Sequence, residues 1–312
     1  MKNKTAIYHW WSYPNEPSPA KNIRTPIVMS IASLRAVSDI NIVVLDVSEK
    51  DNNWEDLPEM FDFKVYKIKS HLEQYRNRIE GWPYLSRIYD INNWSKNESS
   101  IDTIMYVDSD VFFLRNPEPF DTSPEKFVFD GWNSGFFYYK FKNNNFEQFF
   151  DIFNSYTKSA IYSQDIRNIM KKYVGYDAWY GVWDEMILTY MSREHPELFN
   201  ITGVNEHATS RVIQYVDKDK IKMFHCNGTM VENPINSDKH CRGLFALLAK
   251  EIYLNISKKI NETDMCRFFD KQTLSFCLSR QFSLFEDMKK LLSTKDEYGH
   301  YHIKSMLSEP IL

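Results

Sequence analysis

The chain has 312 residues, of which 43% are hydrophobic and 26% charged, so it can form one large domain or two small ones. This composition excludes a disordered chain, a collagen-like fibre and a small disulfide scaffold. A net charge of −4, from 38 Lys and Arg against 42 Asp and Glu, gives no electrostatic basis for binding nucleic acid. Aromatic residues reach 16%; this would suit sugar stacking, but a core rich in Phe and Tyr is the simpler explanation.

The cysteines and the lengths of the apolar runs indicate the cellular compartment in which the protein is expected. Cys226, Cys241, Cys266 and Cys277 include no CxxC pair, which argues against a zinc cluster. The N-terminus lacks the apolar run of a secretory signal, and no stretch approaches 18 uninterrupted apolar residues. We therefore expect reduced thiols in a cytoplasmic protein without a transmembrane segment, and the sequence leaves peripheral attachment to a membrane open.

The chain opens with alternating strands and helices. β-favouring residues predict a strand at 5–11. Thr25 as N-cap, with proline at the first helical position, predicts a helix at 26–37. Residues 40–47 are almost all β-branched or aliphatic, as in a strand buried on both faces, and residues 63–68 alternate like a third strand.

The next elements continue this alternation. Apolar residues at helical spacing predict a helix at 83–94, and the apolar strand at 101–107 ends in acidic residues. The remaining expected elements are strands at 127–129 and 135–141, helices at 146–156 and 184–192, a short strand at 223–226 and helical structure over 243–292. The alternation predicts an α/β sheet with helices on both faces. Such sheets bind ligands at the carboxyl ends of their strands, where the acidic residues lie.

The segment most informative about chemistry is Ile104-Met-Tyr-Val-Asp108-Ser-Asp110-Val-Phe-Phe. An apolar strand delivers two carboxylates two residues apart, and in a regular strand such residues face the same side. Both can then bind one ion, and hard oxygen ligands favour Mg²⁺ or Mn²⁺. A divalent ion there could bridge the phosphates of a nucleotide. Two exposed aspartates at a turn are the simpler alternative.

At these residues the sequence resembles the metal-dependent GT-A glycosyltransferases, especially those of family 8 and family 32. Five further segments match in the family's order, and together they cover roughly residues 5 to 235. They are Ile7-Tyr-His-Trp-Trp-Ser-Tyr-Pro, Leu85-Ser-Arg87-Ile-Tyr, Asp130-Gly-Trp-Asn133-Ser134-Gly135, Trp183-Asp184-Glu185 and Met223-Phe-His225-Cys-Asn-Gly228. The resemblance implies a GT-A (Rossmann-like) α/β fold, with a mixed, mostly parallel sheet flanked by helices.

The resemblance also assigns roles to residues. It implies that His225 joins Asp108 and Asp110 as the third metal ligand, and that Asp184, with Glu185 as second choice, serves the reacting carbon. It places the nucleotide-sugar donor against Tyr8, His9, Trp10, Arg87, Ser109, Asn133, Ser134, Gly135 and Gly228.

Simpler structural roles remain open for several of these residues. His225 could be a core imidazole, Arg87 a surface ion-pair partner and Asn133 a turn residue. Asp184 and Glu185 are adjacent, so on a helix their side chains point about 100° apart. One could therefore serve the reaction while the other only stabilises the N-terminus of the helix through its dipole, and either residue could have that structural role.

One departure from the family pattern affects the mechanism. Family 8 members place a Lys-Pro pair after the H-x-x-G glycine, whereas this chain reads Thr229-Met-Val-Glu-Asn-Pro234. Lys239 or Arg242 could substitute, and retention or inversion at the anomeric carbon stays open.

The resemblance implies a hexosyl- or pentosyltransferase that uses Mn²⁺ or Mg²⁺ and a nucleotide sugar, UDP-sugar before GDP-sugar. The acceptor would be a glycan or glycoprotein hydroxyl. The catalytic domain is expected at 1–240, with a helical C-terminal extension at 241–312 packed on it. Two alternatives are a HAD-like phosphohydrolase, in which the first Asp is the nucleophile, and a non-catalytic sugar- or nucleotide-binding protein of the same fold.

Overall fold

The computed structural model describes the greater part of the first 225 residues and a short piece near the C-terminus. The described residues are 4–12, 17–21, 25–75, 82–98, 100–117, 125–129, 134–141, 144–174, 183–201, 207–209, 222–225, 254–261, 264 and 267.

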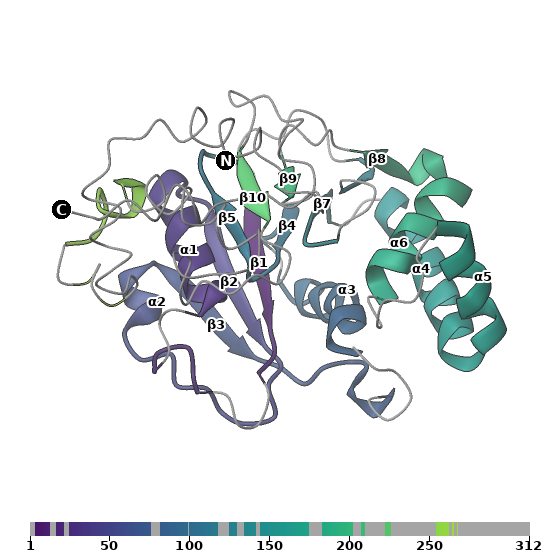
Figure 1. Ribbon diagram of the computed structural model, residues 1–312, viewed down its shortest axis with the longest axis horizontal. Coiled ribbons are helices and arrows are strands. Elements are labelled where there is room, and N and C mark those ends of the chain that lie inside the picture. The colour runs from purple at the N-terminus through teal and green to yellow at the C-terminus, as the bar shows by residue number, and fades with distance from the viewer. Residues whose placement is uncertain are drawn as a thin grey trace, which may run out of the picture.

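A seven-stranded sheet forms the centre of the molecule, in the order β3-β2-β1-β4-β7-β6-β8 (Figure 1). Only β7 runs antiparallel to its neighbours among these strands, so the sheet is mixed and mostly parallel, as the sequence predicts. The strands are β1 (Lys4–Trp10), β2 (Asn41–Asp46), β3 (Phe63–Lys67), β4 (Thr103–Val107), β6 (Phe127–Phe129), β7 (Phe136–Lys140) and β8 (Phe199–Ile201).

The strand order places a ligand-binding edge between β1 and β4. The chain moves outward from β1 through β2 to β3 and then returns to place β4 on the other side of β1. At such a reversal the connections leave the two strands in opposite directions and open a crevice at their carboxyl ends. Asp108 directly follows β4 at this position.

Helices cover both faces of the sheet, because successive side chains of each strand point to opposite faces. One face packs against α1 (Pro26–Val37) and α2 (Leu57–Met60). The other packs against α3 (Trp82–Ser95), α4 (Asn144–Tyr162) and α6 (Trp183–Glu194), with α5 (Gln164–Val174) alongside α4 and α6. The described part also contains two short 3₁₀ turns, η1 (Glu73–Tyr75) and η2 (Pro196–Leu198).

A second, small sheet lies on the α1 side. It has the order β5-β10-β9, with β5 at Val111–Phe113, β9 at His207–Thr209 and β10 at Met223–His225. Strand β10 is antiparallel to β5, and Val111 lies opposite His225. Since only three residues separate the end of β4 from the start of β5, the aspartates lie where the two sheets meet.

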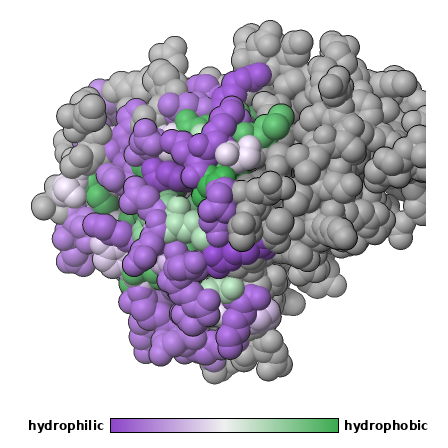
Figure 2. Space-filling view, turned by 90° about the vertical axis from the view of Figure 1, so that its left-hand side faces the viewer, coloured by the Kyte–Doolittle hydropathy of each residue, from purple (hydrophilic) through white to green (hydrophobic). Residues whose placement is uncertain are grey.

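The described C-terminal piece, 254–261, packs on the same face as α1. Ile256 is buried in the hydrophobic cluster that contains the inner side of α1. Arg267 forms two hydrogen bonds with the Asp56 carboxylate, at 2.9 and 3.0 Å. Figure 2 shows this side of the molecule, and its described residues are mostly hydrophilic, with hydrophobic ones in small separate spots. Most of the predicted extension at 241–312 lies outside the described residues.

Some expectations about local structure need correction. Thr25 holds the N-cap position of α1, but its hydroxyl makes no capping bond; the Thr25 carbonyl instead accepts from the amides of Val28 and Met29. The predicted helix at 146–156 is longer, extending to Tyr162, and α5 follows it without having been expected. No helix in the described part is both long and apolar enough to cross a bilayer.

Stacked aromatic rings hold α4 to the sheet and generate a stability prediction. Phe149 is 1% exposed, and its ring stacks on that of Phe127 at 4.2 Å. We expect Phe149→Ala to lower the free energy of unfolding by about 3–5 kcal/mol in urea denaturation, because it leaves a cavity. Its neighbour Phe150 is only partly buried, so Phe150→Ala should cost clearly less. Equal losses for the two variants would contradict this account of the core.

Candidate functional site

A tight turn, rather than a continuous strand, delivers the two aspartates. The Val111 amide donates to the Asp108 carbonyl at 3.2 Å, which closes a turn over residues 108–111. The Asp108 amide donates to the Gly135 carbonyl at 2.7 Å, which fixes the turn to the start of β7. The side chains therefore converge because the chain bends between β4 and β5, and not because they alternate along one strand as the sequence suggested.

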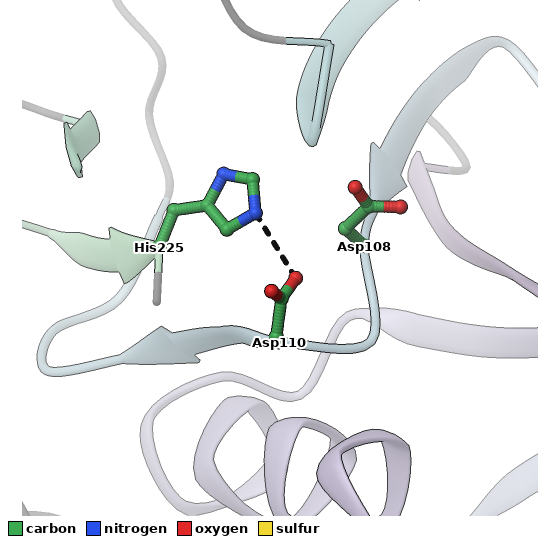
Figure 3. Close-up of side chains that lie close together, drawn as sticks. All are labelled: Asp108, Asp110 and His225. Carbon is green, nitrogen blue, oxygen red and sulfur yellow. Dashed lines mark ion pairs between the residues drawn. The ribbon is translucent and has the colours of Figure 1, made fainter. Parts of the chain in front are cut away.

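Strand β10 brings His225 to these aspartates from more than a hundred residues away. His225 is 3% exposed, and its Nε2 lies 3.0 Å from Oδ1 of Asp110. The three side chains point into the same space (Figure 3). One ligand atom from each lies within 4.8 Å of the others, and we call Asp108, Asp110 and His225 the Asp–Asp–His group.

The Asp–Asp–His group fits a divalent cation. Neighbouring ligands of an octahedral ion at about 2.1 Å are about 3.0 Å apart, and opposite ligands about 4.2 Å apart. The Nε2–Oδ1 pair is already at 3.0 Å, and the group as a whole would need to contract by less than about 1 Å. Two carboxylates and an imidazole suit Mn²⁺ or Mg²⁺, with remaining positions for other oxygen ligands.

A buried arginine lies behind Asp108. Arg87 of α3 is 2% exposed, and its Nη1 donates to Asp108 Oδ1 and to the Tyr106 hydroxyl, both at 2.7 Å. Arg87 also donates to the Ser134 hydroxyl and forms an ion pair with Asp184 at the start of α6. Arg87 therefore ties together α3, β4, α6 and the short segment that leads into β7.

The charges of this network are strongly coupled. Burial by itself would lower the pKa of the Arg87 guanidinium, but Asp108 and Asp184 hold that pKa well above its ordinary value. Burial raises the pKa of the Tyr106 hydroxyl, so Tyr106 remains a neutral donor to Asp108. Three carboxylates, those of Asp108, Asp110 and Asp184, surround this region against the single guanidinium of Arg87, and such an excess of carboxylates favours a cation.

Asp184 lies deeper than a catalytic role alone would suggest. Its side chain is fully buried against Arg87, and burial raises the pKa of its carboxyl while Arg87 opposes that rise. Asp184 Oδ1 accepts no hydrogen bond within the described residues. Glu185, next in the first turn of α6, is 8% exposed. The structure thus brings Asp184, but not Glu185, into the Arg87 network.

The side chains at the end of β1 are engaged inside the protein. Tyr8 is fully buried, with its hydroxyl 3.0 Å from that of Ser30. The His9 Nε2 lies 3.0 Å from Asp90 Oδ2. The Trp10 ring contacts the Trp54 ring edge-on at 6.3 Å. Direct contacts of the Tyr8 and His9 side chains with a nucleotide would therefore require these pairs to rearrange.

The other predicted donor-binding residues divide into two sets. Ser109 lies in the turn between the aspartates, Ser134 accepts from Arg87, and the Gly135 carbonyl accepts from the Asp108 amide. Outside the described residues lie Asn133, Gly228, Lys239 and Arg242.

Another acidic residue at the same edge is structural. Asp46 ends β2, and its carboxylate accepts from the Ser48 amide at 3.0 Å, the Asn52 side chain at 2.9 Å and the Trp54 indole at 3.2 Å. It is 2% exposed. Asp46 therefore organises the loop after β2 and offers little to a ligand.

Sequence reasoning missed two buried polar side chains, Tyr106 beside Asp108 and Asp90 beside His9. Tyr106 precedes Asp108 by two residues, and that spacing along β4 could have indicated a contact. Asp90 follows Arg87 by three residues on α3 and accepts from His9, the Ser70 hydroxyl at 2.8 Å and the His71 amide at 2.6 Å. Polar residues at i and i+3 of a helix with an apolar face were the available signal.

Comparisons with known proteins give similarity at the level of fold. No protein-family model matches the sequence, and no curated protein sequence matches it. Solved structures with some similarity include apo mouse xyloside xylosyltransferase 1, at TM-score 0.44 and 16% identity over 72% of this chain and 98% of that one. Apo GlyE, a glycosyltransferase of Streptococcus pneumoniae TIGR4, gives 0.43 and 12% over 72% of this chain and 54% of that one. The apo bifunctional glycosyltransferase WbbM gives 0.47 and 9% over 86% and 52%.

The chain therefore spans nearly all of the xylosyltransferase structure but about half of GlyE and of WbbM. TM-scores below 0.5 at such identities do not carry an activity from one protein to another. What this chain does has to follow from its own residues.

The Arg87 network predicts a large cost for removing its cation. We expect Arg87→Met to lower the free energy of unfolding by about 3–5 kcal/mol, because Asp184 is left buried without a counter-ion. Adding Asp184→Asn should recover part of that loss. Urea denaturation followed by tryptophan fluorescence measures both variants.

The exposed ion pair of Arg267 with Asp56 provides the control for this prediction. Arg267→Met should cost about 0–1 kcal/mol, because solvent screens the pair. If Arg87→Met is no more destabilising than Arg267→Met, Arg87 does not hold these segments together.

Proposed function

We propose that this protein is a GT-A-type glycosyltransferase that moves a sugar from a nucleotide-diphosphate sugar to a hydroxyl of a glycan or glycoprotein acceptor. One observation carries the proposal. Asp108, Asp110 and His225, brought together from two sheets, meet at the carboxyl end of β4, where the strand order reverses. An oxygen-rich cation site at that edge suits a diphosphate ligand.

Asp108, Asp110 and His225 would hold Mn²⁺ or Mg²⁺ in this function. When bound, such an ion would supply Lewis acidity toward the diphosphate leaving group. The protein's own contribution is orientation: the two hydrogen bonds from Arg87 and Tyr106 both go to Asp108 Oδ1. Asp108 Oδ2 accepts no such bond within the described residues and is the oxygen that would face the ion.

Arg87 has a positioning role in this proposal. Its guanidinium is bonded to Asp108, Asp184 and Ser134, so it links the proposed metal site to α6. Asp184 Oδ1 is buried and lacks a hydrogen bond within the described residues, so a hydroxyl of the donor sugar could bond to it only after the side chains around it move. On these terms Asp184 is the proposed carboxylate near the reacting carbon, with Glu185 second.

The donor is proposed to be a UDP-sugar, with a GDP-sugar as second choice, as the resemblance implies. Tyr8, His9, Trp10, Ser109, Asn133, Ser134, Gly135 and Gly228 remain proposed donor-binding residues. For Tyr8 and His9 the backbone at the end of β1 is the better candidate, because their side chains are engaged elsewhere.

Nothing in the described structure favours a phosphohydrolase. In that chemistry Asp108 would attack phosphorus, but its Oδ1 already accepts hydrogen bonds from Arg87 and Tyr106, which lowers the nucleophilicity of that oxygen. A non-catalytic binding protein would not need the buried carboxylate Asp184 beside the cation site.

The metal assignment predicts the behaviour of Asp110→Asn. Removing the charge of one ligand should lower Mn²⁺ affinity and abolish sugar transfer while the protein stays folded. Asp102, at the other end of β4, provides the control, and Asp102→Asn should keep both properties. Transfer by Asp110→Asn at the wild-type rate in excess EDTA would rule out the assignment.

The position of Asp184 predicts that its substitution affects sugar transfer and nucleotide-sugar hydrolysis together. We expect Asp184→Asn to lower kcat for transfer and for nucleotide-sugar hydrolysis alike, by about 10²-fold or more, because both reactions need the donor sugar held correctly. Glu185→Gln should have a smaller effect on kcat. Steady-state kinetics with both variants, and the anomeric configuration of the product, make the comparison.

If both variants keep near-wild-type kcat, the first turn of α6 is structural only. The catalytic group would then lie elsewhere, and Asp130, outside the described residues, would be the next candidate.

A further inference from the structure

Strand β5 meets helix α1 along its outer edge. On its inner edge β5 pairs with β10, and the Leu114 amide just beyond β5 donates to the Lys222 carbonyl at 2.9 Å on that side. Backbone groups of successive residues in a strand point alternately to its two edges. The Val111 carbonyl and the Phe113 amide therefore point away from β10, toward α1.

Two serines of α1 satisfy these outward backbone groups. The Ser30 hydroxyl donates to the Val111 carbonyl, and the Phe113 amide donates to the Ser33 hydroxyl at 3.0 Å. Ser30 and Ser33 are both fully buried. We call them the serine pair. On this edge of β5 they replace the hydrogen bonds that a neighbouring strand would make. Ser30 provides the donor for the Val111 carbonyl, and Ser33 provides the acceptor for the Phe113 amide.

The direction of every hydrogen bond around the serine pair is determined. Ser33 gives its single hydroxyl proton to the Ser30 carbonyl at 2.7 Å, so toward Phe113 it can only accept. Ser30 gives its proton to Val111, so the Tyr8 hydroxyl, 3.0 Å away, must donate to Ser30. The serine pair thus connects β5 to α1 and, through Tyr8, to the central strand β1.

Such an arrangement has a cost that calls for an explanation. Serine stabilises the interior of a helix less than alanine does, because its hydroxyl can form hydrogen bonds with backbone groups that compete with those of the helix. Burial of an unbonded hydroxyl or amide costs about 1–3 kcal/mol. Serines at two buried positions of one helix are therefore favourable only because β5 bonds to both.

We propose that Ser30 and Ser33 are positioning residues for the metal ligand Asp110. Asp110 directly precedes Val111, and Val111 lies opposite His225 in the pairing of β5 with β10. A shift of β5 along or away from α1 would change the distance between Asp110 and its two partners. This inference rests on the proposed cation site, and it assigns to α1 the task of keeping that site assembled.

The side chain of Tyr8 has a structural role, which leaves the backbone of Tyr8 as the part proposed to contact the nucleotide. Tyr8 lies on β1, next to β4, and its hydroxyl extends the serine pair into the main sheet. The aspartate turn is then held from both ends: Asp108 by Arg87 and Gly135, and Val111 by Ser30.

The test compares Ser33→Ala with a matched control. Ser95 of α3 is also a fully buried serine, but its hydroxyl makes no hydrogen bond within the described residues, so Ser95→Ala controls for removal of a buried hydroxyl. Alanine is the better helix former, and both variants should fold. The dissociation constant for Mn²⁺, from the electron paramagnetic resonance signal of the free ion, should rise about tenfold in Ser33→Ala and stay unchanged in Ser95→Ala.

Two further measurements separate positioning from general loosening. In metal-free protein, hydrogen exchange of the Phe113 amide should be faster in Ser33→Ala than in wild type or Ser95→Ala, because the amide has lost its acceptor. Ser33→Thr keeps the hydroxyl and should keep the wild-type Mn²⁺ affinity, whatever its effect on the melting temperature.

The outcomes distinguish this inference from the proposed function. Wild-type protein that does not bind Mn²⁺ overturns the cation site itself, and with it the task assigned to the serine pair. Wild-type binding with an unchanged dissociation constant in Ser33→Ala, or an equal rise in Ser95→Ala, overturns the positioning role and leaves the cation site standing.

Discussion

The site depends most on one buried guanidinium. Arg87 is almost entirely removed from water, and a cation in that position is stable only with carboxylates beside it. Asp108 and Asp184 provide them from β4 and from the start of α6. The same contacts fix the relative positions of α3, the end of β4 and the start of α6. A proposed metal ligand and a proposed catalytic carboxylate are therefore held at a set separation.

A second constraint acts on the other side of the aspartate turn. The two sheets meet at residues 108–111, where the chain leaves β4 and enters β5. Such a junction exposes backbone groups that must be satisfied when buried. The Gly135 carbonyl does this for Asp108, and Ser30 and Ser33 do it for β5. Asp108 is then fixed through its backbone and its side chain, and Asp110 directly precedes a strand whose outer edge is bonded to α1.

Much of the architecture could be predicted from the sequence, because buried parallel strands leave uninterrupted apolar runs. The strands at Asn41–Asp46 and Thr103–Val107 and the helix Pro26–Val37 follow from such patterns. Grouping Asp108 with Asp110 was also predictable, since the pair directly follows an apolar run. Helix α5 was missed although Ile166 and Met170 lie at helical spacing; other apolar residues of the same helix, Ile169 and Tyr173, are exposed rather than buried.

The partner of each polar side chain could not be predicted from the sequence. Tyr8 and Asp184 look alike in sequence terms, as polar residues at the ends of elements near a binding edge. The structure turns Tyr8 toward Ser30 on α1 and places Asp184 against Arg87. These partners are 22 and 97 residues away, and no local pattern encodes such pairs.

The claim that Asp108, Asp110 and His225 hold a divalent ion for a nucleotide diphosphate is tested most directly by calorimetric titration. UDP and GDP would each be titrated into the full chain with Mn²⁺ and again with EDTA. The account predicts that at least one nucleotide binds with Mn²⁺, and that its binding is lost or much weaker with EDTA, since both aspartates repel a diphosphate until a cation lies between them. Binding that is equally tight with Mn²⁺ and with EDTA, or no binding of either nucleotide, would contradict it.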